Sequence, residues 1–188
     1  MMKKYIRIVA GQYRRTPIEV PDIAGLRPTP DRVRETVFNW LTHFWAGEFG
    51  DKQVLDLFAG SGALGFEAAS RGVSHVQMVE SDPKATAALR HLRDRLKADV
   101  VRIQGGLAQS AITRMENSRY DLIFLDPPFG RGWFPSILEQ VLPLLKPNAL
   151  VYAESEDLVS APDNYVALRQ ARAGAVHYQL FQLTASLK

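Results

Sequence analysis

The tetrapeptide Asp126-Pro127-Pro128-Phe129 contains residue types that suggest a specific chemistry. Its two prolines fix the backbone and remove two N–H donors, so the turn can offer the Asp126 carboxylate and the Pro127 carbonyl as acceptors. An exocyclic amine of a nucleic-acid base is a poor nucleophile, because its lone pair is delocalised into the ring. If both acceptors bind its N–H groups, the lone pair is freed to attack a methyl donor while Phe129 stacks on the flipped base. We therefore expect these four residues to be catalytic.

A glycine-rich segment earlier in the chain could hold the methyl donor. Residues 56–65 read Asp-Leu-Phe-Ala-Gly-Ser-Gly-Ala-Leu-Gly. Gly60 and Gly62 permit a tight turn close to a ligand, and Gly65 permits close packing of a helix on a strand. The glycines alone would serve a dinucleotide equally well. Asp56 favours S-adenosylmethionine, because its carboxylate would repel a pyrophosphate and attract the methionyl ammonium group.

The ends of the next two expected strands could complete a cofactor site. Glu80 ends the second strand, where an acid can accept hydrogen bonds from both ribose hydroxyls of an adenosine. At the end of the third strand Gly106 offers no side chain, so the adenine is expected to rest on backbone groups and on Leu107. The expected cofactor-binding residues are Asp56, Phe58, Ala59, Gly60, Ser61, Gly62, Glu80, Ser81, Gly106 and Leu107.

Short apolar runs alternate with helical stretches through most of the chain, which is typical of βαβ units. The pattern predicts parallel strands at 54–58, 75–79, 100–103, 122–125 and 150–153, and helices beginning at Asp82-Pro83 and spanning 135–145. The last runs, 165–168 and 176–183, are joined by a turn at Ala173-Gly174 and predict an antiparallel pair. We therefore predict an α/β, Rossmann-like class I methyltransferase fold, with a seven-stranded, mostly parallel sheet and an antiparallel last strand.

The first 28 residues are expected to form a basic extension of the same domain, with residues 29–188 as the methyltransferase region. Apolar alternation from Ile6 to Ala10 and at 18–20 predicts a β-hairpin. Thr29-Pro30 predicts a helix start with a hydroxyl cap. In that helix Val33, Val37, Leu41 and Phe44 should face the core, and Arg32, Arg34, Glu35 and Asn39 should point elsewhere.

Positive charge is concentrated at the beginning of the chain. Residues 1–34 hold eight basic and three acidic residues, a net +5, whereas the whole chain is only +3. Such a field suits a polyanionic partner, although a basic terminus that merely aids solubility would look the same. The expected RNA-binding residues are Arg14, Arg15, Arg27, Arg32, Arg34 and, beside the catalytic turn, Arg131.

Composition argues against several other classes of protein. The sequence has no cysteine and only four well-separated histidines, so no metal site is expected. Its apolar runs are far shorter than a membrane span, and the basic start lacks the apolar stretch of a signal peptide. We expect a cytoplasmic monomer with no membrane partner.

The sequence resembles the bacterial small-subunit ribosomal RNA guanine-N2 methyltransferases of the RsmD type over nearly its whole length. The resemblance is carried by residues 7–14, 26–41, 56–65 and 126–129, of which the second segment is the most family-specific. It implies methylation of N2 of one guanine in 16S rRNA, within the small ribosomal subunit or an assembly intermediate. S-adenosylmethionine would be converted to S-adenosylhomocysteine.

Other functions stay open at this point. The same fold could act on adenine N6 of DNA or RNA, since the motif is shared between these enzymes, or on a protein glutamine. A nicotinamide-dependent oxidoreductase would use the glycines but leaves residues 126–129 unexplained. A non-catalytic RNA-binding module is a further class, against which Asp126 and Glu80 argue.

Overall fold

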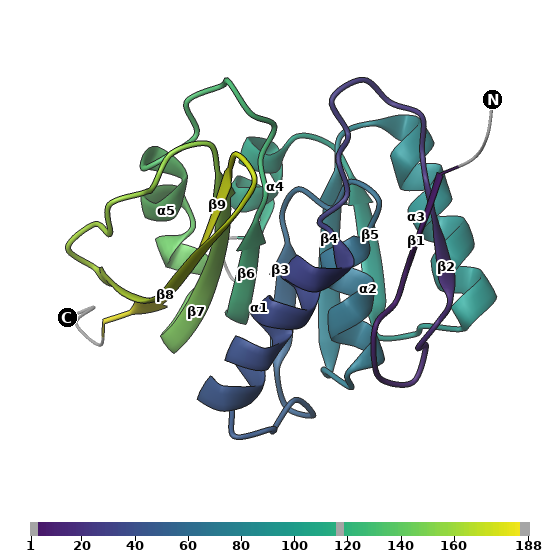
Figure 1. Ribbon diagram of the computed structural model, residues 1–188, viewed down its shortest axis with the longest axis horizontal. Helices are drawn as coiled ribbons and strands as arrows, with labels where there is room; N and C mark the ends of the chain where they lie inside the picture. The colour runs from purple at the N-terminus through teal and green to yellow at the C-terminus, as the bar shows by residue number, and fades with distance from the viewer. Residues whose placement is uncertain (1–3, 116–118, 185–188) are drawn as a thin grey trace.

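A seven-stranded sheet forms the centre of the protein, described here by a computed structural model over residues 4–115 and 119–184. Its strand order is β5-β4-β3-β6-β7-β9-β8, in which only β9 runs against the rest (Figure 1). The strands are β3 (Gln53–Asp56), β4 (His75–Glu80), β5 (Val101–Gly105), β6 (Tyr120–Leu125), β7 (Leu145–Ser155), β8 (Tyr165–Ala173) and β9 (Val176–Leu183). The predicted sheet and its antiparallel final pair are confirmed.

Helices cover both faces of this sheet (Figure 1). One face carries α1 (Asp31–Phe44), α2 (Ala63–Ser70) and α3 (Pro83–Leu96), and the other carries α4 (Ala108–Arg114) and α5 (Ser136–Gln140). Because successive strand residues point to opposite faces, Val54 packs with the first group of helices and Leu55 with the second. Both residues are fully buried, so β3 lies between the two hydrophobic cores, one on each face of the sheet.

The helix expected over 135–145 is shorter than predicted. Only α5 and a single 3₁₀ turn (Leu142–Leu144) form there, and β7 already begins at Leu145. Pro143 lies inside the expected helix and has no N–H to donate, which explains why the α-helix stops before it. The start of α3 is as predicted, since the Asp82 carboxylate accepts hydrogen bonds from the N–H groups of Lys84 and Ala85.

The N-terminal hairpin forms a separate small sheet that lies against α2 and α3 (Figure 1). Its strands are β1 (Lys4–Arg7) and β2 (Pro17–Val20). The N–H groups of Val9 and Ala10 donate to the buried Glu67 carboxylate of α2 at 2.8 and 3.1 Å. The Arg95 guanidinium of α3 donates to the Pro17 carbonyl at 2.8 Å. The hairpin is thus fixed to the helices by hydrogen bonds from both of its arms.

Two expectations about α1 are wrong. Thr29 does not cap the helix, because its hydroxyl donates instead to Glu154 at 2.9 Å and Pro30 occupies the cap position. Arg34 does not point away from the core but is completely buried, with its guanidinium bonded to Asp31 and 3.5 Å from the Glu67 carboxylate. A buried arginine that already has two acidic partners is not available to RNA.

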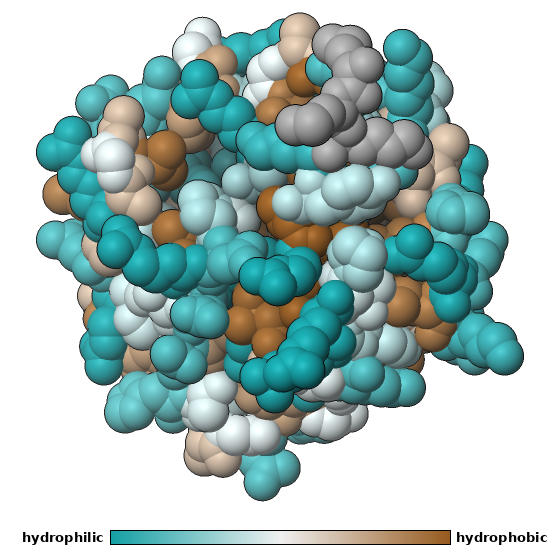
Figure 2. Space-filling view, turned by 45° about the vertical axis from the view of Figure 1, so that its right-hand side comes forward, coloured by the Kyte–Doolittle hydropathy of each residue, from teal (hydrophilic) through white to brown (hydrophobic). Residues whose placement is uncertain are grey.

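The molecular surface is mostly polar on the face shown in Figure 2, where apolar side chains appear in recesses between polar ones. Large apolar side chains that are more than a third exposed include Leu107 and Phe129. Within residues 4–115 and 119–184, no helix has both the length and the apolar character needed to cross a membrane.

Candidate active site

Four acidic side chains stand at the carboxyl ends of four adjacent strands. Along the sheet, Glu80 ends β4, Asp56 ends β3, Asp126 follows β6, and Glu154 lies one residue before the end of β7. Parallel strands place their carboxyl ends at one edge of a sheet, which is where ligands bind in open α/β folds. Among the described residues no three histidine, cysteine or acidic side chains form a set that could hold a metal ion. The carboxylates of this acidic row, Asp56, Glu80, Asp126 and Glu154, are acceptors for N–H donors and partners for cations.

Asp56 is buried at the start of the glycine-rich segment. Its Oδ2 accepts a hydrogen bond from the Gly65 N–H at 3.0 Å, in the first turn of α2. Burial raises the pKa of Asp56 to about 7, and the charges of Glu80 and Glu154 act in the same direction, while the Gly65 N–H opposes them. A carboxylate under these constraints gains strongly from a neighbouring cation.

The glycine-rich turn is held in a shape that larger residues would not tolerate. Gly60 and Gly62 have φ of +53° and +81°, and a Cβ on Gly62 would lie 2.5 Å from a methyl carbon of Leu89. A Cβ on Gly65 would lie 2.5 Å from Cε of Met78 and 3.0 Å from Oδ2 of Asp56, so a larger residue there would make these side chains shift. The Glu80 carboxylate accepts a hydrogen bond from the Gly60 N–H at 2.7 Å, which ties the turn to β4.

The other predicted residues of this segment lie in the same turn. Ala59 donates its N–H to the Val79 carbonyl at 2.9 Å, and Ser61 is buried. The ring of Phe58 packs edge to face against Trp133, with ring centres 5.0 Å apart. Phe58 thereby connects the glycine-rich turn to the loop that follows Asp126.

A cavity of about 350 Å³ opens beside Glu80, at the ends of β4 and β5. Its lining is Ser81, Pro83, Thr86, Arg90, Gly105 and Gly106. Gly106 has φ of +139° and open space where a Cβ would be, so this backbone leaves room for a flat ring. Leu107 is 63% exposed and is not among the lining residues. Thr86 and Arg90 on α3 were not predicted, because helical spacing gave no reason to select them from other positions.

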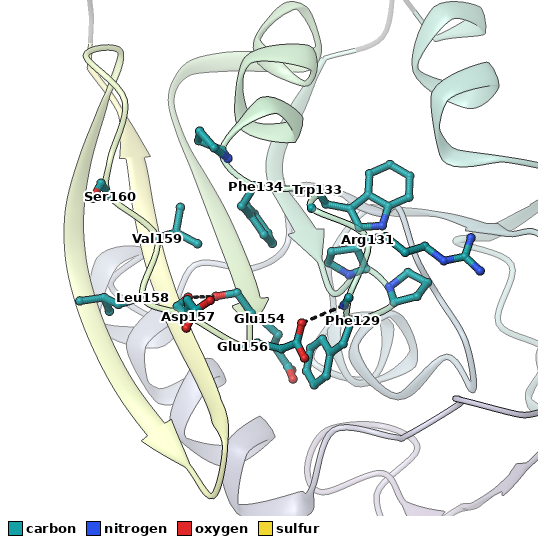
Figure 3. A pocket seen from close by; sticks show the side chains of 16 residues that line it. Phe129, Arg131, Trp133, Phe134, Glu154, Glu156, Asp157, Leu158, Val159 and Ser160 are labelled. Carbon is teal, nitrogen blue, oxygen red and sulfur yellow. Dashed lines mark hydrogen bonds between the residues drawn. The ribbon is translucent and has the colours of Figure 1, made fainter.

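A second cavity, of about 400 Å³, opens beside the loop that follows β6 (Figure 3). It is lined by residues 127–135 and 154–160, two loops that face each other. The Glu156 carboxylate accepts a hydrogen bond from the Gly130 N–H at 2.8 Å and joins the loops at the rim. Phe129 is 38% exposed and contributes to the lining. The volume is within the range of small-molecule sites and large enough for one flipped base.

Asp126 directly precedes the loop that lines the second cavity and is close to Glu154 and Asp56. Burial raises the pKa of Asp126 well above its usual range, and the charges of Glu154 and then Asp56 raise it further. The carboxyl group would therefore gain from any donor or cation that compensates its charge. That requirement matches the predicted role of Asp126 as an acceptor for an amine.

Glu154 is a site residue that the sequence reasoning missed. It is 6% exposed, and its Oε1 accepts hydrogen bonds from the hydroxyls of Thr29 and Tyr152, both at 2.9 Å. Burial raises the pKa of Glu154, and these two hydrogen bonds oppose the rise. The available signal was an acid directly after the apolar run 149–153, the same pattern that singled out Asp56, Glu80 and Asp126.

The predicted RNA-binding arginines are exposed with one exception. Arg14, Arg15, Arg27, Arg32 and Arg131 are all on the surface, whereas Arg34 is buried. In Figure 3 the Arg131 side chain leaves the loop that follows β6 and points away from the cavity. Five of the six positions are thus accessible to a polyanion, and their contacts stay a prediction.

Comparisons with known proteins agree on one family. The family model described as "Conserved hypothetical protein 95" matches residues 6–182. The chain is 42% identical to ribosomal RNA small subunit methyltransferase D of Escherichia coli, covering 96% of this chain and 91% of that protein. It is 36% identical to the protein of the same name from Haemophilus influenzae, covering 96% and 95%.

A solved structure of the Escherichia coli protein yhhF superimposes with a TM-score of 0.85 at 39% sequence identity, covering 97% of this chain and all of that one. The sheet order, the acidic row and the turn at 126–129 accompany a match over nearly the full length. The chain therefore belongs to the family of ribosomal RNA small subunit methyltransferase D.

Proposed function

We propose that this protein transfers a methyl group from S-adenosylmethionine to the exocyclic N2 of a guanine in 16S rRNA. The observation that carries the proposal is the position of the turn at 126–129, between the glycine-rich turn with its acidic neighbours and a cavity of about 400 Å³. The turn is thereby next to a place for a cofactor and a place for a base.

The residues at the ends of β3, β4 and β5 fit the cofactor. Asp56, buried and with a raised pKa, suits the methionyl ammonium group, and the cavity at Ser81 and Gly106 suits adenine. Glu80 stands between these two places and can accept hydrogen bonds from the ribose hydroxyls. S-adenosylmethionine would supply an electrophilic methyl group on a sulfonium centre. A pyrophosphate would meet two acids here, which disfavours a nicotinamide cofactor.

The residues of the turn would orient the base and shift electron density on its amine. The Asp126 carboxylate and the Pro127 carbonyl accept the two N–H bonds of the amine, and Phe129 stacks on the ring. The prolines keep this turn stiff, so little reorganisation is needed at the moment of reaction. No strong base is required before attack, because the nitrogen becomes acidic once it carries the methyl group.

The target class follows from the family. The relatives from Escherichia coli and Haemophilus influenzae are both named ribosomal RNA small subunit methyltransferase D. Guanine N2 is the position implied by the RsmD resemblance, and adenine N6 is the alternative that the turn itself leaves open. The deciding experiment is tritiated methyl transfer to small subunits from a strain that lacks the enzyme, followed by nucleoside analysis. We expect N2-methylguanosine, and labelled N6-methyladenosine would contradict the proposal.

Cofactor binding is expected to depend on pH through Asp56. In the free protein this group holds its proton below about pH 7, whereas a neighbouring ammonium group favours the ionised form. Binding must then release a proton, so the affinity rises as pH increases through the pKa of Asp56. We expect the Kd of S-adenosylhomocysteine, which carries the same ammonium group, to fall about tenfold between about pH 6 and pH 8.

Isothermal titration calorimetry in two buffers of different ionisation enthalpy measures both the Kd and the proton released. Asp56→Asn is the matched control, because an amide oxygen can still accept from the Gly65 N–H without titrating. The pH dependence should flatten in that variant. A wild-type Kd that stays constant over this range would remove the assigned role of Asp56.

Residues 1–28 are proposed as the RNA-contacting extension, together with the exposed start of α1. Reversing Arg14, Arg15 and Arg32 to glutamate should weaken RNA binding and flatten its dependence on salt. Each lost phosphate contact lowers the slope of log K against log salt by about 0.7 to 0.9. The matched control reverses Arg114 and Arg172, which are exposed on α4 and β8. An unchanged slope in the first variant, measured by filter binding, would place the RNA surface elsewhere.

A further inference from the structure

Glu154 lies directly beside Asp126 at the edge of the sheet. Leu125 of β6 and Ala153 of β7 are paired in parallel register, so Asp126, just after β6, and Glu154, in β7, each follow a paired residue, and the Glu154 charge acts on Asp126. Adjacent strands are about 4.8 Å apart, and residues paired across them point to the same face. Glu154 also lines the cavity that the turn at 126–129 opens into. In the view of Figure 3 its side chain extends toward the ring of Phe129.

The Glu154 carboxylate is fixed through one of its two oxygens. Oε1 accepts from both Thr29 and Tyr152, whose side chains are 4% and 0% exposed. Over the part of the chain that the structure describes, no donor bonds to Oε2. Two hydroxyl donors favour the ionised form of Glu154 over that of Asp126. The second oxygen, Oε2, therefore belongs to a residue that is held in place at the cavity, and its hydrogen-bonding capacity is unused.

The two candidate bases differ at the atom next to their amine. On guanine the N2 amine is flanked by N1–H, which is a donor, whereas on adenine the N6 amine is flanked by N1, which is an acceptor. A second carboxylate, next to the one that accepts from the amine, would accept the N1–H of guanine. On adenine the same carboxylate would face the lone pair of N1. Leaving such a buried charge unpaired is costly, so the contact discriminates between the bases.

We propose that Glu154 is the specificity-determining residue that accepts the N1–H of guanine, while Asp126 accepts from the neighbouring N2 amine. Thr29 and Tyr152 are positioning residues that hold Glu154 in its acceptor form. The inference rests on the proposed function and gives its preference for guanine a physical cause. It also gives a role to Thr29, which belongs to the family-specific segment 26–41 but does not cap its helix.

The test uses a substrate analogue that changes the same contact. 2-Aminopurine keeps the exocyclic 2-amine but carries an acceptor at N1 and a hydrogen in place of O6. Small subunits with guanosine or 2-aminopurine at the methylated position are therefore compared in the wild-type protein and in a Glu154 variant, so that the effect of O6 cancels and the N1 contact is isolated. We expect the wild-type protein to favour guanosine in kcat/KM by roughly 10- to 100-fold. Glu154→Gln keeps an oxygen for Thr29 and Tyr152 and turns an NH₂ donor toward N1. In that variant the preference should fall to about one or invert, because the guanosine rate falls more than that of the analogue.

The cofactor affinity and the substrate preference of further variants separate this role from a purely structural one. The affinity for S-adenosylhomocysteine, measured by calorimetry, should change much less in Glu154→Gln than the guanosine preference does, because Glu154 acts on Asp56 only through its charge. Thr29→Val and Tyr152→Phe should lower the guanosine preference in the same direction, and they carry the test if Glu154→Gln does not fold. Equal losses for both substrates, or an unchanged preference in the folded variants, would overturn the inference. Wild-type product identified as N6-methyladenosine would overturn the proposed function as well, whereas N2-methylguanosine with an unchanged preference overturns the inference alone.

Discussion

Replacing Asp126 by alanine is expected to lower the rate of methyl transfer by about 10²- to 10³-fold, the usual cost of removing one preorganised group that stabilises a transition state. The carboxylate is the charged acceptor of the turn, and burial between Glu154 and Asp56 makes its interaction with an N–H donor strong. Single-turnover transfer of a tritiated methyl group to small subunits measures the rate. The affinity for S-adenosylhomocysteine should change little, because Asp126 is assigned to the base rather than to the cofactor.

The matched control for this variant is Asp121→Ala. Asp121 lies at the beginning of β6, at the opposite end of this strand from Asp126, where it is partly exposed and paired with Lys146 at 2.7 Å. Its loss should leave both the rate and the cofactor affinity close to wild type. Full activity in Asp126→Ala would contradict the assigned role of the turn.

Replacing Arg34 by alanine is expected to destabilise the fold by about 3–5 kcal/mol, because it removes one partner of a buried ion pair. Glu67 keeps its hydrogen bonds from Val9, Ala10 and Arg71 but loses the nearby guanidinium charge. The Thr29 carbonyl also loses its hydrogen bond from Arg34 Nε, at 3.2 Å. Urea unfolding followed by circular dichroism measures the free energy of unfolding.

Arg32→Ala is the control that makes this prediction specific. Arg32 is exposed and lies only two positions earlier in α1. Its removal should change the free energy of unfolding by less than about 0.5 kcal/mol, as is usual for surface positions, while weakening RNA binding. Arg34→Ala should thus lower the free energy of unfolding, whereas Arg32→Ala should lower only the affinity for RNA. Wild-type stability in Arg34→Ala, combined with weaker RNA binding, would restore the original expectation for that residue.

The architecture could be predicted because it follows from local patterns. Buried parallel strands are continuous apolar runs, the Asp82-Pro83 start of α3 is a recognisable cap, and the Ala173-Gly174 turn separates two strands without a helix between them. Asp56 was selected from its position before the glycines, Glu80 from the end of an apolar run, and Asp126 from the Asp-Pro-Pro-Phe tetrapeptide after another such run. Position at a strand end is local information, and the topology then brings the strand ends together.

The shorter helix at 135–145 follows from a local signal, Pro143, whereas the other corrections involve partners that are distant in the sequence. The local sequence predicts that Thr29 caps the helix. In the structure the Thr29 hydroxyl donates instead to Glu154, which lies 125 residues later in the chain. Arg34 occupies the apolar stripe of α1 with Val37 and Leu41, at positions i, i+3 and i+7. That spacing indicated that Arg34 is buried, whereas the charge of Arg34 argued against burial. The sequence did not reveal that Glu67 of α2 compensates this charge. The place of Glu154 beside Asp126 depends on the register of β6 and β7, which no local sequence pattern encodes.

A crystal structure of the protein with bound S-adenosylhomocysteine would test the central claim most directly. The account predicts that the ammonium group lies at Asp56, the ribose at Glu80 and the adenine between Ser81 and Gly106. The sulfur atom should then face the turn formed by Asp126 and Pro127, with the cavity at Phe129 open beyond it. A sulfur atom directed away from that turn, or a ligand bound at another edge of the sheet, would contradict the account.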